Sequence, residues 1–152
     1  MSSLEQAYYW SQIGLTVIAF FAAIGAYAQL QTFKRFELLK VLEDPRVRKA
    51  RRTLFKKMHA TTASSTAWWD VDDELEEAAS DICASYDVVG ILAKRRNFHF
   101  FTKEWSHNIC WTYETLEEYV THRRSDNPIA YHGYRKLYKH AKRFDRRPVS
   151  SN

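Results

Sequence analysis

The chain has 152 residues and a formal net charge of +5, and it contains only four glycines and three prolines. This length allows one membrane span and one domain of about 110 residues. The two cysteines, Cys83 and Cys110, form no CxxC motif, which excludes a disulfide-rich secreted fold and suits a reducing compartment.

Residues 6–33 contain no charged side chain, and this run predicts a transmembrane helix with its span at about residues 8–30. A helix of that length extends about 34 Å, which is enough to cross a hydrocarbon core of about 30 Å. Tyr8, Tyr9 and Trp10 suit one lipid–water interface. Lys34 and Arg35 can snorkel to the other interface.

The charges on either side of this run predict its orientation. Glu5 is the only charge before it, whereas residues 34–57 hold ten basic and three acidic side chains. The positive-inside rule therefore predicts a single-pass protein of the inner (plasma) membrane, with its N-terminus outside and its C-terminal domain in the cytoplasm. The alternative is a cleaved signal peptide, which would leave a periplasmic helical domain. Ala26-Tyr27-Ala28 resembles a cleavage site, but the segment before it lacks a positive n-region.

The chain divides into a membrane anchor at residues 1–33, a helical domain at 34–147 and a tail at 148–152. No convincing strand pattern is present, so the predicted fold class is all-α. We expect an N-terminal transmembrane helix followed by a four-helix cytoplasmic domain.

Helix signals follow one another after the span, which continues as a helix to about Glu43. Asp44 and Pro45 begin the next helix as its N-cap and first helical residue, and His59–Ala67 is a polar linker. Asp70 caps a third helix that ends near Asn97, Thr102 caps a fourth, and Asp126-Asn127-Pro128 opens a fifth. The apolar stripes of these four helices are Val47, Ala50, Leu54 and Met58; Leu75, Ala79, Ile82, Tyr86, Val89 and Ala93; Trp105, Ile109, Tyr113, Leu116 and Val120; and Tyr131, Tyr134, Leu137, Ala141 and Phe144.

Four motifs carry a family resemblance: DPRVRKARRTLF, ICASYDVVGILAKRRNFHF, WSHNICWTYETLEEYVTHRR and NPIAYHGYRKLYKHAKRF. Together with the single span they resemble a family of small bacterial membrane-anchored helical proteins that is catalogued as a domain of unknown function. The resemblance covers most of residues 33–144. It implies an N-terminal anchor and a helical cytoplasmic domain, and it implies no activity and no catalytic residue.

The charge blocks predict surfaces for partners. Residues 70–87 hold eight acidic side chains and no base, so we expect this helix to pack against or near a basic one. We also expect a basic surface after the span to meet anionic lipid head groups. Its residues are Lys34, Arg35, Arg46, Arg48, Lys49, Arg52, Lys56 and Lys57.

Small residues line one face of the span: Ala19, Ala22, Ala23 and Ala26. Such a face allows close helix contact and predicts self-association or membership of a larger membrane complex. Alanines that simply face lipid are the equal alternative.

Metal ligation is a weak interpretation of the acidic run at 70–77 and of Cys83, His107 and Cys110. The acidic run lacks EF-hand spacing and is typical of a solvated helix N-terminus. The cysteines lack the paired spacing of structural zinc sites and are typical of core positions. We therefore predict no metal and no cofactor.

Two Arg–His spacings, Arg52 with His59 and Arg135 with His140, match an Arg-x4–6-His ribonuclease pattern, and the second resembles the motif of HEPN-type ribonucleases. So many arginines and histidines produce such spacings by chance, so we predict no catalytic residue. The basic helix from Tyr134 to Phe144 suits anionic lipid or an acidic protein partner better than nucleic acid, although its aromatic residues are compatible with RNA. Its tyrosines at helical spacing predict a buried stripe with a solvated basic face.

These patterns favour a non-enzymatic scaffold, sensor or accessory subunit of a membrane complex. The alternative is a membrane-tethered effector or HEPN-like ribonuclease accessory of an antiviral defence system.

Overall fold

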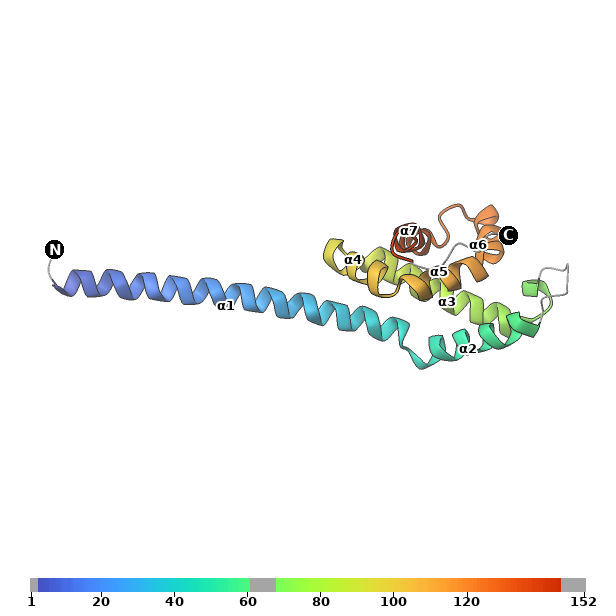
Figure 1. The fold of residues 1–152 in the computed structure, drawn as a ribbon, viewed down its shortest axis with the longest axis horizontal. Coiled ribbons are helices and arrows are strands. Elements are labelled where there is room, and N and C mark those ends of the chain that lie inside the picture. The colour runs from blue at the N-terminus through green and yellow to red at the C-terminus, as the bar shows by residue number, and fades with distance from the viewer. Residues whose placement is uncertain (1–2, 61–67, 146–152) are drawn as a thin grey trace. The chain divides into compact units, whose positions relative to one another are not determined.

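The computed structural model describes the backbone of residues 3–60 and 68–145, with side chains except at 3, 4, 58–60 and 95. All regular structure in these ranges is helical and no strand is present, which confirms the predicted all-α class (Figure 1). The chain forms two compact units, Met1–Glu37 and Leu38–Asn152.

Helix α1 spans Ser3–Leu42 without a break, so its end is confirmed to within one residue of the prediction. Its Glu5–Leu42 part is the one described helix that is long and apolar enough to cross a membrane, and none of its most apolar stretch is buried. Large side chains such as Trp10, Ile18 and Phe21 are exposed around the helix. The last turn of α1 belongs to the second unit, where Leu38 and Leu42 are buried in the core.

Helix α2, Pro45–Ala60, begins where the sequence predicts. The Asp44 carboxylate accepts a hydrogen bond from the backbone N–H of Arg46 at 2.8 Å, which satisfies one of the donors that a helix N-terminus leaves open. Val47, Ala50 and Leu54 are buried as expected. The Met58 side chain and most of the predicted linker lie outside the described residues.

Helix α3, Asp73–Leu92, is capped by Asp72 and not by Asp70. Asp70 belongs to a short 3-10 helix, η1, at Trp68–Asp70. Tertiary contacts hold this turn, because the Trp68 ring stacks on Tyr119 with 5.6 Å between centroids. The Asp72 carboxylate then accepts from Leu75 N at 3.0 Å.

The prediction that Asn97 stops a helix and Thr102 starts another is wrong. Both residues are buried inside helix α4, Arg95–Glu104, and the Thr102 hydroxyl donates to the Phe98 carbonyl at 3.0 Å. The predicted fourth helix continues as α5, Ser106–Thr115, and α6, Glu117–Asp126. Trp105 and Leu116, with φ near −105° and ψ near 10°, separate these three helices.

Helix α7, His132–Ala141, begins later than the Asp126-Asn127-Pro128 signal predicts. Tyr131 precedes it in the left-handed conformation, with φ at 53°. The Asp87 carboxylate of α3 accepts from Tyr134 N at 3.1 Å and serves as the cap. The cap therefore comes from a tertiary contact and not from the local sequence.

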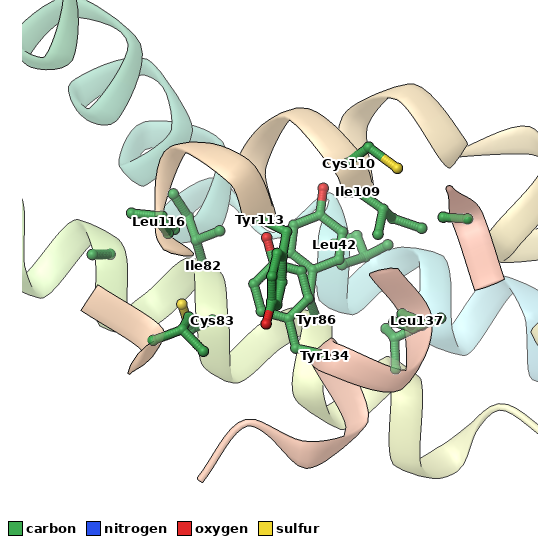
Figure 2. Close-up of a cluster of buried hydrophobic side chains, with 14 of the residues drawn as sticks. Leu42, Ile82, Cys83, Tyr86, Ile109, Cys110, Tyr113, Leu116, Tyr134 and Leu137 are labelled. Atoms are coloured by element: carbon green, nitrogen blue, oxygen red, sulfur yellow. The ribbon is translucent and has the colours of Figure 1, made fainter. Parts of the chain in front are cut away.

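The core is formed where α2 and α7 pack against α3 and α5 packs on α7. The α3–α7 crossing depends on two glycines, because a Cβ at Gly90 would overlap the Gly133 carbonyl and a Cβ at Gly133 would crowd the Asp87 carbonyl. Around this crossing lie stacked tyrosines, with Tyr86 and Tyr134 rings 4.9 Å apart (Figure 2).

Candidate functional site

The acidic helix α3 packs along the basic helix α2, which confirms the predicted pairing. Lys57 Nζ lies 2.8 Å from an Asp72 carboxylate oxygen and 2.9 Å from one of Glu74. Arg46 lies 3.2 Å from Asp81, by the same kind of contact. The hydrogen bond from Lys57 lowers the pKa of Asp72, and the two carboxylates raise the pKa of Lys57.

These contacts show that the residues of the predicted membrane surface lie in different places. Arg46 and Lys57 face carboxylates of α3. Lys49 lines a hollow of about 230 Å³ that also contains Glu77 and Asp81. Lys34 and Arg35 belong to the first unit. The remaining three, Arg48, Arg52 and Lys56, lie together on another face of α2.

A pocket of about 510 Å³ opens between that face and helix α5. Four basic residues and two aromatic residues are among the nine that line it, and none of the nine is acidic. From α2 come Arg48, Arg51, Arg52, Phe55 and Lys56, and from α5 come His107, Asn108, Trp111 and Thr112.

The four bases of the pocket differ in their partners: Arg48 and Arg51 lie near Glu43, whereas Arg52 and Lys56 are exposed. Arg51 donates a hydrogen bond to the Leu42 carbonyl at 2.8 Å, and its guanidinium lies 5.9 Å from the Trp105 ring centroid. Glu43 lies 3.6 Å from Arg51 and 3.9 Å from Arg48. Arg52 and Lys56 are exposed, and no carboxylate of the described residues forms an ion pair with either.

The aromatic side of the pocket is formed by Phe55 and Trp111, whose ring centroids are 5.9 Å apart at 46°. Phe55 is 53% exposed, although it belongs to a residue type that is usually buried. The pocket therefore places an aromatic surface beside several bases.

Beneath the pocket lies a set of buried hydroxyl groups. The Tyr134 hydroxyl donates to Thr112 Oγ1 at 2.8 Å, and that hydroxyl donates to the Asn108 carbonyl at 2.6 Å. The Tyr86 hydroxyl is buried, faces Arg51 and Thr112, and makes no hydrogen bond of normal geometry within the described part of the chain. Burial raises the pKa of Tyr86, which keeps the phenol neutral.

The arrangement can hold an anion against Arg52 and Lys56 and a flat apolar group against Phe55 and Trp111. The sequence predicted the bases Arg48, Arg52 and Lys56 as a surface but missed the α5 side of the pocket. No local signal marks that side, because it depends on how α5 is rotated within the fold.

Arg135 and His140 point to different sides of α7. His140 Nδ1 lies 3.0 Å from the Lys136 carbonyl, and its ring packs on Phe98 with centroids 5.0 Å apart. Arg135 is exposed five residues earlier, which is about 140° around the helix. The His59 side chain, which the other spacing pairs with Arg52, lies outside the described residues.

The candidate metal ligands are dispersed. Cys83 and Cys110 are buried, and burial raises the pKa of the Cys83 thiol. The side chain of His107 is 65% exposed and lies 4.0 Å from Asp145. Within residues 3–60 and 68–145, no three His, Cys, Asp or Glu side chains are close enough to hold a metal ion.

Helix α7 has the predicted buried stripe and basic face. Tyr134, Leu137 and Ala141 are buried, whereas Arg135 and Lys139 are exposed. In α1, the four alanines of the small face are exposed like their neighbours, so burial does not distinguish a contact face from a lipid face.

No protein-family model matches the chain, and no curated protein or solved structure is detectably similar to it. The resemblance of the four sequence motifs to an anchored helical family therefore stays a prediction.

Proposed function

We propose that the protein is a non-enzymatic, membrane-anchored scaffold, sensor or accessory subunit of a membrane complex. The observation that carries the proposal is the exposure of α1. Its most apolar stretch has no buried residue, and its large side chains point outward on every side. In water such a surface is strongly unfavourable, whereas in a bilayer it is matched by lipid tails.

The orientation in this proposal places the N-terminus outside and the helices α2–α7 in the cytoplasm, as one helical module. Basic side chains after the span favour this side of the plasma membrane. Lys34, Arg35 and the exposed bases of α2 would then lie near anionic head groups. The dispersed positions of Arg135 and His140 support a non-enzymatic role over the ribonuclease alternative.

Self-association is part of the same proposal. The face formed by Ala19, Ala22, Ala23 and Ala26 would allow a second span to approach closely, in a homo-oligomer or beside another subunit. The domain would then be presented in several copies at the cytoplasmic surface.

Membrane fractionation and tag accessibility in intact bacterial cells test the proposal. We expect the full chain to resist carbonate extraction, to keep its uncleaved mass, and to shield a C-terminal tag from external protease. Replacing Lys34 and Arg35 by glutamate while changing Glu5 to lysine should raise the fraction in the reversed orientation. The matched control replaces Lys139 and Arg143 by glutamate and should leave the orientation unchanged.

Three results would contradict the proposal. Release by carbonate would exclude a span, and a mass reduced by about the first 28 residues would indicate the periplasmic alternative. Digestion of the C-terminal tag by external protease in intact cells would show that the C-terminal domain lies outside, opposite to the proposed orientation.

A further inference from the structure

We propose that the pocket between α2 and α5 binds a nucleotide, that is, a small molecule that combines phosphate groups with a planar ring. This inference concerns residues of the second unit alone, so it goes beyond the membrane anchor and does not depend on it.

The phosphate side is given by the row Arg48, Arg52 and Lys56. Residues four apart lie on one face of a helix, so these three charges form a line along α2. Arg46 and Lys57 of α2 have carboxylate partners on α3, whereas Arg52 and Lys56 have none among the described residues. Arginine and lysine at such spacing bind phosphate oxygens through charge-assisted hydrogen bonds.

Glu43 distinguishes the bases that are already paired from those that are free to bind an anion. It lies within 4 Å of Arg51 and Arg48, so it partly compensates these two and fixes Arg51 at the inner end of the pocket. Anion binding is therefore assigned to the outer end, at Arg52 and Lys56.

The ring side is given by Phe55 and Trp111. Their rings are tilted against each other at 46°, and Phe55 remains half exposed. Nucleobases stack on aromatic side chains of this kind without demanding a particular base. An anionic lipid head group has phosphate but no planar ring, so the aromatic residues favour a nucleotide over a lipid.

The size and polarity of the pocket agree with this ligand class. Its volume of about 510 Å³ falls in the usual range of about 300–1,000 Å³ for small-molecule sites. Its lining also includes the exposed side-chain amide of Asn108. This amide can hydrogen-bond to the hydroxyl groups of a sugar.

Calorimetric titration of the full chain in nanodiscs of neutral phosphatidylcholine tests the proposal. The probes are ATP, AMP, adenosine and inorganic pyrophosphate. We expect ATP to bind more tightly than either adenosine or pyrophosphate, because only ATP engages both sides of the pocket. Lys56→Glu should weaken ATP binding by about tenfold or more, since it replaces an attraction by a repulsion.

Two further variants separate the parts of the site. Lys139→Glu on α7 makes the same charge change outside the pocket and should leave ATP binding unchanged. Phe55→Leu keeps an apolar side chain and should weaken ATP and AMP binding while leaving pyrophosphate binding unchanged. Because Phe55 and Lys56 are exposed, both variants should fold, which near-ultraviolet circular dichroism verifies.

The proposal is overturned if no probe binds at millimolar concentration, or if Lys139→Glu weakens ATP binding as much as Lys56→Glu does. It is also overturned if ATP fails to bind while anionic phosphatidylglycerol vesicles bind in a Lys56-dependent manner, because the occupant is then a lipid head group. Each of these results leaves the membrane-anchor proposal intact, since that rests on α1.

Discussion

Helices α1 and α3 are both long and contain many apolar residues, but they meet opposite environments. Helix α3 buries eight residues in a stripe, and its acidic side chains lie elsewhere on its surface. The most apolar stretch of α1 buries none. Length and composition thus distinguish the two helices less well than the distribution of apolar residues around the axis.

Their glycines show the same contrast. At Gly14 and Gly25 of α1 a Cβ atom would meet nothing within 4 Å. At Gly90 of α3 it would overlap the backbone of Gly133. Glycine in α3 is therefore a requirement of packing, whereas glycine in α1 is not required by any described neighbour.

The largest expected effect comes from Gly90→Val. The added side chain would separate α3 from α7, so we expect a loss of about 4 kcal/mol or more in the free energy of unfolding of the second unit. Gly25→Val is the matched change in α1 and should leave that free energy within about 0.5 kcal/mol. Urea unfolding in detergent, followed by near-ultraviolet circular dichroism, measures both. Equal stability of the two variants would show that the α3–α7 crossing is not as close as described.

A smaller effect is expected from Ile82→Ala. Ile82 is fully buried, and truncation of such a side chain costs about 2–5 kcal/mol through lost contacts and a cavity. Ile18→Ala in α1 removes the same atoms from a residue that is 66% exposed. It should leave the unfolding of the second unit unchanged in the same urea experiment. A similar loss for both variants would break the contrast between the two helices.

The smallest effect concerns the acidic face of α3 and its pH dependence. The folded-state pKa of Asp72 lies below its usual 3.8, so its contribution to stability is present above that value and is lost as the pH falls through the folded-state pKa. The pKa of Lys57 lies above 10.5, so its contribution is lost as the pH rises through the folded-state pKa.

Asp72→Asn isolates this pair, because asparagine can still cap α3 while it carries no charge. We expect the wild type to be more stable than the variant at pH 7, and the difference to shrink as the pH falls below about 4. Thermal unfolding across this pH range measures the difference. A difference that stays constant down to the most acidic pH would mean that the Asp72 charge does not contribute.

Local signals predicted some parts of this fold and tertiary contacts determined others. Asp44 and Pro45 predicted the start of α2 because the cap bonds to its own helix. The start of α3 was misplaced because Trp68 packs on Tyr119, about 50 residues away in the sequence. The start of α7 was misplaced because its cap is Asp87 of another helix. Contacts distant in sequence leave no local pattern to read.

The candidate site divides in the same way. The many bases of α2 predicted a surface for an anionic partner. Three bases of that predicted surface, Arg48, Arg52 and Lys56, line the pocket. Arg46 and Lys57 belonged to the same predicted surface, but the acidic residues of α3 engage them. Trp111 could not be assigned to the site from the sequence, because its pairing with Phe55 of α2 is a tertiary contact.

The stacked tyrosines of the core make the fold visible to spectroscopy. Tyr86 lies parallel to Tyr134, and Tyr113 lies parallel to Tyr138 with 4.1 Å between centroids. Burial raises the pKa of both Tyr86 and Tyr134 above the usual 10, so these phenols ionise only after the core opens. An alkaline titration followed by phenolate absorbance therefore separates the solvent-exposed tyrosines from the buried ones, and the delayed fraction reports unfolding without any added label.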